Sequence, residues 1–191
     1  MGQATQSGAL LYVAPALIGA VTALTVAVVT DAFTRLRESK IRRQTTALQY
    51  RERQLGEFYG PLISLIEQIQ SVYQIKTDLL KAGANRPSPE QREKIDDYFW
   101  RTHFNPLHVA IRGLFRSKLY LLEDGKKPES FVKYFQHSVQ EEAQKEIARD
   151  LHIDTSFLEG VEYPRDLDTT VQKTLDGLMA DYRRDLKSLN G

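Results

Sequence analysis

Arg101 and His108 are the two residues whose types and spacing could do chemistry together. Six residues, 102–107, separate them. Histidine can move a proton near neutral pH, and arginine can hold a phosphate group, so the pair could act on a phosphate ester. The alternative is structural: the stem of Arg101 lies along a helix end with its charge in water, and His108 is satisfied by its neighbours near the start of the next helix.

The Arg101/His108 pair is similar to the Arg-to-His signature of the HEPN helical RNases. In that family, an arginine and a histidine carried on helices of two protomers meet at a dimer interface and cleave RNA without a metal ion. The resemblance implies that Arg101 and His108 are catalytic and that RNA is the substrate. Thr102 stands where the family usually places a polar residue.

Other established motifs of catalysis or metal binding are absent from the sequence. It contains no glycine-rich phosphate loop, no H-E-x-x-H pair, no nucleophile elbow and no calcium loop. The chain has no cysteine, which excludes disulfides, thiolate metal sites and a cysteine nucleophile. The 4 histidines show no ligand spacing along the chain, so the sequence predicts no metal site and no cofactor.

Charged residues are balanced in number but not in position. Lysine and arginine total 26 against 25 for aspartate and glutamate, which gives a formal net charge of +1. A broad nucleic-acid-binding surface needs excess cations to neutralise phosphates, so the balance argues against one. The first charged side chain is Asp31, and residues 1–30 carry none.

The uncharged stretch over residues 9–29 predicts a membrane-spanning helix. A helix needs about 20 predominantly apolar residues to cross the hydrocarbon core, and this stretch has that length. A cleaved signal peptide is the alternative, but it would begin with a positive region, and residues 1–10 contain neither lysine nor arginine. We therefore expect residues 1–30 to form a retained N-terminal anchor.

Basic residues directly after this stretch indicate its orientation. They are Arg35, Arg37, Lys40, Arg42 and Arg43. The positive-inside rule places them, and the C-terminal part of the chain, in the cytosol, with the N-terminus outside. The sequence thus predicts a single-pass protein of the cell (inner) membrane whose basic residues lie near anionic lipid headgroups.

Small residues share one face of the predicted anchor at helical spacings of three and four. They are Ala16, Gly19, Ala20, Ala23 and Ala27. Small side chains let two helix backbones approach closely, and packing has to drive association in lipid because apolar burial does not. This face predicts a homo-oligomer that assembles through its anchors.

The remaining chain is predicted to be all-α. No glycine or proline interrupts residues 20–55, so the anchor should continue as a juxtamembrane helical stalk over residues 31–59. We interpret Gly60-Pro61 as a helix end followed by a helix start, and Asn105-Pro106 as a second break. Ser88, Pro89 and Gln91 predict a capped start. Apolar residues at helical spacing predict a cytosolic bundle of five or six helices over residues 60–191.

Short motifs across this bundle resemble those of a set of bacterial single-span helical membrane proteins of unassigned function. The motifs are Glu57-Phe58-Tyr59-Gly60-Pro61-Leu62, Trp100 with Pro106-Leu107, Pro128-x-Ser130-Phe131 leading to His137, and Tyr163-Pro164. The resemblance implies the fold and no activity. More loosely, the span, the size of the helical domain and the Arg101/His108 pair resemble the membrane accessory proteins of type VI-B CRISPR systems, which assemble into a membrane pore during antiviral defence.

Three hypotheses for function follow. The first is a non-enzymatic, homo-oligomeric membrane effector or accessory protein that forms a pore and acts in antiviral defence. The second is a membrane-tethered RNase that uses Arg101 and His108. The third is an adaptor whose bundle binds a protein partner while the anchor only localises it.

Overall fold

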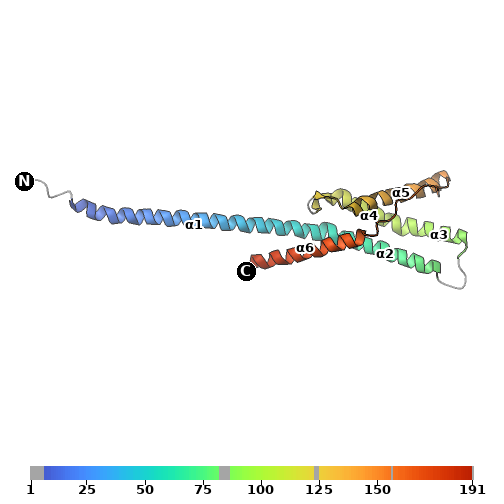
Figure 1. The fold of residues 1–191 in the computed structure, drawn as a ribbon, viewed down its shortest axis with the longest axis horizontal. Helices are drawn as coiled ribbons and strands as arrows, with labels where there is room; N and C mark the ends of the chain where they lie inside the picture. Colours follow the sequence, from blue (N-terminus) through green and yellow to red (C-terminus); the bar gives the residue numbers. More distant parts are fainter. Residues whose placement is uncertain (1–6, 82–86, 123–124, 156, 191) are drawn as a thin grey trace, which may run out of the picture. The chain divides into compact units, whose positions relative to one another are not determined.

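The structure, a computed structural model, describes residues 7–81, 87–122, 125–155 and 157–190, with side chains from residue 21 to residue 189 of these ranges. Within them every regular element is helical and no strand occurs, which confirms the all-α prediction (Figure 1). The chain forms two compact units: a first unit that ends at Ala47, and a second unit, Leu48–Asn190. The second unit begins inside the segment 31–59 that was predicted to be a stalk.

The first unit consists of the N-terminal part of α1 (Ser7–Gln54). Every side chain from residue 21 to residue 43 is exposed, including the apolar ones. Among the described side chains, no helix is long and apolar enough to cross a membrane. Residues 9–20 of the predicted anchor lie outside the part of the chain whose side chains are described.

The second unit is a bundle in which several helices are joined end to end (Figure 1). The last turn of α1 continues through a π turn, η1 (Leu55–Tyr59), into α2 (Gly60–Lys81). In the same way, α3 (Pro89–Phe99) continues through a π turn, η2 (Trp100–Phe104), into α4 (Asn105–Lys118). The prediction of separate helices on either side of each proline is therefore wrong, and the described part of the bundle has four continuous helices. The elements that follow α4 are the 3₁₀ turn η3 (Leu119–Leu121), α5 (Glu129–Leu151) and α6 (Leu167–Asn190).

The first π turn carries the helix past Gly60-Pro61. Gly60 has helical angles, φ −62° and ψ −53°, and its N–H donates to the Leu55 carbonyl five residues earlier. A proline inside a regular α-helix lacks one N–H and drives its ring onto the carbonyl four residues before it. The wider turn relieves this conflict, and such single turns are the usual form of a π-helix. Gly60 is required for close approach, since a Cβ there would lie 2.7 Å from the Leu55 oxygen.

The second π turn does the same before Asn105-Pro106. The Asn105 N–H donates to the Trp100 carbonyl, again five residues earlier, and Asn105 is helical at φ −58° and ψ −47°.

The predicted helix start at Ser88 is confirmed. The Gln91 N–H donates to the Ser88 hydroxyl at 3.2 Å, and the Ser88 N–H donates to the Gln91 side chain at 2.8 Å.

The hydrophobic core of the second unit is built around Phe58. Phe58 is fully buried, and its ring centroid lies 4.9 Å from that of Tyr59, 6.1 Å from Phe115 and 6.3 Å from Phe131. These rings join η1 to α4 and α5, while α2 packs against α4 and α6. Apolar residues of every long helix of the bundle contribute to this core. They include Leu62, Ile66, Ile69, Ile111, Leu121, Leu122, Tyr134, Leu167, Val171 and Leu178.

Polar contacts tie the end of α1 into the same bundle. The Arg51 guanidinium pairs with Asp185 and lies 3.7 Å from a carboxylate oxygen of Asp181, both on α6. The buried Gln54 side chain donates to the Leu121 carbonyl at 2.8 Å. These contacts explain why the residues from Leu48 onward belong to the second unit.

Candidate functional site

A cluster of two histidines and one glutamate lies between α4 and α5. His108 comes from α4, and His137 and Glu141 stand four residues apart on α5, so they share one face of that helix. A Glu141 oxygen lies 3.3 Å from His137 Nε2 and 3.6 Å from His108 Nε2. One ligand atom from each of the three residues falls within 4.8 Å of the others. We call His108, His137 and Glu141 the histidine–glutamate cluster.

Each imidazole of the cluster is held by a partner at its other nitrogen. His108 Nδ1 lies 2.7 Å from the Tyr134 hydroxyl in a buried hydrogen bond. His137 Nδ1 lies 2.6 Å from the Val161 carbonyl oxygen. Because a carbonyl can only accept, His137 must carry a proton on Nδ1. The Nε2 atoms of both rings are consequently the ones that face Glu141.

Burial sets the protonation of His108. The residue is 2% exposed, and burial lowers the pKa of its imidazole to about 4, against the opposing attraction of the Glu141 carboxylate. The charges of His137 and Arg112 lower this pKa further. At neutral pH His108 is therefore a neutral imidazole with one free nitrogen lone pair.

His137 and Glu141 behave differently because they form a pair. Burial alone would lower the pKa of His137, but its hydrogen bonds to Glu141 and to the Val161 carbonyl outweigh burial and raise it. Burial would likewise raise the pKa of Glu141, whereas the hydrogen bond with His137 and the electrostatic effect of the neighbouring histidines and Lys145 lower it overall. The carboxylate of Glu141 is thus ionised and available as an anionic donor.

Aromatic rings surround the cluster. The Trp100 ring centroid lies 5.8 Å from that of His108, and the Tyr163 ring lies 5.5 Å from His137 and 5.8 Å from Tyr134. Trp100 is the first residue of η2, so the second π turn helps to place it over His108. The buried Tyr163 hydroxyl has no hydrogen-bond partner among the described residues. His108 is buried within this shell, whereas His137 and Glu141 are half-buried.

A second polar contact fixes the spacing of α4 and α5 beside the cluster. One Arg112 Nη donates to the Ser138 carbonyl at 3.0 Å, and the other donates to Glu142 at 2.5 Å. Ser138 is fully buried, and the Arg112 side chain is only 11% exposed. Because Arg112 lies one turn after His108 and Ser138 directly follows His137, this contact holds the two histidine-bearing turns together.

The structure does not bring the predicted pair Arg101 and His108 together. The Arg101 side chain is 56% exposed and pairs with Asp97 at 2.5 Å, one turn earlier on the same helix. The described residues show no hydrogen bond, ion pair or ring contact between Arg101 and His108. A general acid or base needs access to substrate and a pKa near the working pH, and the burial of His108 provides neither. The burial of His108 therefore argues against the RNase hypothesis, in which the two residues would meet from two protomers.

The other predicted site residues lie on α1. Ala23 and Ala27 of the small-residue face are exposed, while Ala16, Gly19 and Ala20 lie outside the described side chains. The basic residues Arg35, Arg37, Lys40, Arg42 and Arg43 are all exposed. Of these, Arg35 pairs with Asp31 at 2.8 Å.

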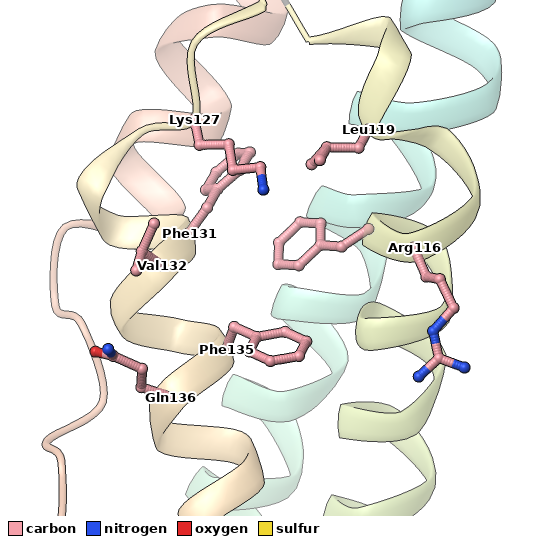
Figure 2. A pocket seen from close by; sticks show the side chains of 8 residues that line it. Arg116, Leu119, Lys127, Phe131, Val132, Phe135 and Gln136 are labelled. Atoms are coloured by element: carbon pink, nitrogen blue, oxygen red, sulfur yellow. The ribbon is translucent and has the colours of Figure 1, made fainter.

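A separate apolar pocket of about 430 Å³ opens between α4 and the start of α5. Figure 2 shows Phe131 across from Leu119 with the Lys127 ammonium between them, Phe135 further along α5, and Arg116 on the opposite helix. Its wall also contains Phe115 of the core. An apolar chain that carries an anionic group is the kind of ligand such a pocket suits.

The sequence contains one signal for the histidine–glutamate cluster, which the spacing between histidines does not reveal. His137 and Glu141 are four apart within a predicted helix, which places two donor groups on one face. His108 could not be assigned to them, because its distance from α5 depends on how the helices pack. The sequence predicted no metal site, whereas the two imidazoles and the carboxylate could together hold a cation.

Comparison of the chain with protein-family models, curated proteins and solved structures finds no match. The resemblances drawn from short motifs in the sequence therefore stay predictions.

Proposed function

We propose that this chain is a membrane-anchored helical protein, held by one N-terminal span over residues 9–29, with its second unit on the cytosolic side. The observation that supports this most is the apolar surface of α1. Val21, Leu24, Val26 and Val28 expose 62%, 67%, 59% and 61% of their area. A helix that is apolar all round is unfavourable in water and is typical of a buried or membrane-spanning segment.

Two further features of α1 support the span. The Thr25 hydroxyl donates to the Val21 carbonyl at 2.8 Å, so this polar group is satisfied inside its own helix, as a hydrocarbon environment requires. Charged residues begin at Asp31, and five cations follow by residue 43, which favours the cytosol for the C-terminal side. The proposed location is the cell (inner) membrane, with the N-terminus outside.

Two matched double variants test the span in the full chain. Val21→Lys/Leu24→Lys places two charges inside the proposed span, and Phe33→Lys/Leu36→Lys places two charges at the same spacing and similar exposure beyond it. A lysine near the middle of a span costs about 2.5–3.5 kcal/mol on insertion scales. Wild type and the outer variant should stay in the membrane fraction after alkaline extraction, and the inner variant should be released. Equal release of both variants would contradict the proposal.

We extend this proposal to assembly and activity: the protein is a non-enzymatic, homo-oligomeric effector or accessory protein whose assembled anchors open a pore. Support comes from the small-residue face, of which Ala23 and Ala27 are exposed on α1, and from the poor access to His108. The looser resemblance to the type VI-B CRISPR accessory proteins makes antiviral defence the setting we propose.

Assembly is tested by cross-linking the full chain in membranes. Gly19→Leu and Ala23→Leu enlarge the small-residue face, whereas Val21→Leu adds volume off that face and serves as the control. The oligomer should be lost in the first two variants and kept in the control. Release of a dye from vesicles that contain the protein should follow the same order, and a monomer throughout would contradict both assembly and the pore.

A further inference from the structure

We infer that the histidine–glutamate cluster is a binding site for one divalent transition-metal ion, of the class represented by Zn²⁺. His108, His137 and Glu141 would be its protein ligands. The inference concerns the second unit alone and does not rest on the proposed membrane anchor.

The spacing of the donor atoms is the first argument. Zinc lies about 2.0–2.1 Å from histidine nitrogen and about 2.0–2.2 Å from carboxylate oxygen, so two such donors around a tetrahedral ion lie about 3.3 Å apart. The Glu141 oxygen is 3.3 Å from His137 Nε2 and 3.6 Å from His108 Nε2. The two distances from the Glu141 oxygen are therefore close to the separation that one ion would impose, and all three donor atoms lie within 4.8 Å of one another.

The hydrogen bonds behind the two rings are the second argument. A metal-bound histidine almost always donates its other ring N–H to a carbonyl, carboxylate or other acceptor, which fixes the ring and its tautomer. The Val161 carbonyl serves this role for His137 at 2.6 Å, and the Tyr134 hydroxyl can serve it for His108 at 2.7 Å. Both Nε2 atoms are thereby directed to the same side as the Glu141 carboxylate.

The donor types select the class of metal. Imidazole nitrogen suits Zn²⁺, Fe²⁺, Ni²⁺ and Cu²⁺, whereas Mg²⁺ and Ca²⁺ prefer an all-oxygen shell. Two histidines and one glutamate leave at least one coordination position for water or another ligand, as in catalytic zinc and non-haem iron sites. Glu141 is the most exposed of the three, with 34% of its side chain accessible, so an ion could reach the cluster from solvent on that side.

A metal-free arrangement of the same residues is the rival explanation. In it, His137 Nε2–H donates to Glu141, and His108 carries its proton on Nε2 and accepts from the Tyr134 hydroxyl at Nδ1. The Tyr134 hydroxyl can donate or accept, so it fits this tautomer of His108 as well as the metal-bound one. Only the metal-site explanation predicts that the protein takes up a metal ion. Only that explanation predicts that loss of the Tyr134 hydroxyl weakens the uptake.

Direct binding to the untagged full chain in detergent micelles tests the inference. After chelator treatment, the protein is titrated with Co²⁺ and Zn²⁺ by calorimetry and by absorption of the cobalt complex. Trp100 is the only tryptophan and its ring lies 5.8 Å from His108, so bound Co²⁺ should quench its fluorescence and added Zn²⁺ should restore it. We expect one ion per chain and an absorption band of four- or five-coordinate cobalt with nitrogen and oxygen ligands.

Ligand variants separate the cluster from incidental binding. His137→Gln and Glu141→Gln should each weaken Zn²⁺ affinity at least 10-fold, while His103→Gln and Glu146→Gln, outside the cluster, should bind like wild type. Circular dichroism checks that each variant keeps its helices. Absence of uptake by wild type, or equal affinity in the cluster variants and their controls, would overturn the inference.

A pair of tyrosine variants tests the metal site independently if a ligand variant fails to fold. Tyr134→Phe removes the hydroxyl that bonds to His108 and keeps the ring. Tyr163→Phe is the matched control, because the ring of Tyr163 lies beside His137 and its buried hydroxyl has no hydrogen-bond partner among the described residues. Loss of an outer partner of a metal-bound histidine typically costs 10–100-fold in metal affinity. Tyr134→Phe should show that loss and Tyr163→Phe should not. Equal affinity of the two variants would contradict a role for His108 as ligand.

Discussion

At two positions in the bundle a helix continues past a proline by means of a π turn, but the two turns have different surroundings. The turn before Pro61 directs Phe58 and Tyr59 into the core, where they are 0% and 2% exposed. The turn before Pro106 buries Trp100 against His108 and leaves Arg101 at the surface. The first turn thus organises packing, and the second borders the histidine–glutamate cluster.

The residue that precedes each proline shows the difference most clearly. At the first turn it is Gly60, where any Cβ would meet the Leu55 carbonyl. At the second turn it is Asn105, whose buried side-chain oxygen has no hydrogen-bond partner among the described residues. A π turn therefore does not itself demand glycine; the local approach of the backbone decides. π turns within α-helices frequently lie at functional sites, and the second of these turns borders the candidate site.

Removing Phe58 should have the largest effect. Phe58→Ala leaves a cavity between three other rings and should lower the free energy of unfolding by about 3–5 kcal/mol. Denaturant unfolding of the full chain in mild detergent, followed by circular dichroism, measures it. Tyr98→Ala, just before the second turn and 55% exposed, should cost about 0.5 kcal/mol. Similar losses in both variants would remove the distinction between the two turns.

Filling Gly60 should have an intermediate effect. In Gly60→Ala the new methyl group would lie 2.7 Å from the Leu55 oxygen, so the backbone has to shift, at a cost of about 1–3 kcal/mol. Gly113→Ala in α4 meets nothing within 4 Å and should instead stabilise the helix by up to about 1 kcal/mol. The two substitutions should therefore change the unfolding midpoint in opposite directions, and a gain for Gly60→Ala would show that the turn is not constrained there.

Replacing one arginine near each turn should give a smaller contrast. Arg51 lies one turn before Leu55 and bridges to Asp181 and Asp185 on α6, so Arg51→Met should cost about 1 kcal/mol. Arg101→Met removes a more exposed pair with Asp97 on its own helix and should cost less than about 0.5 kcal/mol. Thermal unfolding at low and high salt measures both, and a larger loss for Arg101→Met would reverse the contrast.

The smallest expected effect concerns pH. Hydrogen bonds from Lys118, and then from Arg53, hold the pKa of Glu57 in the first turn below its usual value. The unfolded chain takes up this proton at a higher pH than the folded chain, so the stabilisation is present above the ordinary glutamate pKa and is lost as the pH falls. Glu57→Gln should therefore show a shallower loss of stability between neutral pH and about pH 3 than wild type. Glu93→Gln, at an exposed position, is the control and should lose stability with falling pH as wild type does. If Glu93→Gln instead showed a loss as shallow as that of Glu57→Gln, the assignment to Glu57 would be contradicted.

Several elements of the fold follow from residues that are close in sequence. The capping box of Ser88 and Gln91 formed as predicted, because both of its hydrogen bonds lie within one helical turn. The all-α character of the second unit likewise follows from apolar residues at helical spacing in its long segments. Gly60-Pro61 was interpreted wrongly for an equally local reason: the dipeptide is typical of a helix boundary, and the rule takes no account of the core that Phe58 and Tyr59 enter.

The sequence by itself determined that the described chain is helical, where a capped helix begins, and that an uncharged stretch precedes all the charged residues. Only the tertiary structure decided that helices pass through both prolines, and that His108 meets His137 and Glu141 while Arg101 turns to the surface. The physical reason is the distance along the sequence over which each interaction acts. Helix propensity and capping act within a turn, whereas the approach of α4 to α5 depends on Phe115 packing against Phe131 at 5.0 Å and on Arg112 bonding across to Ser138.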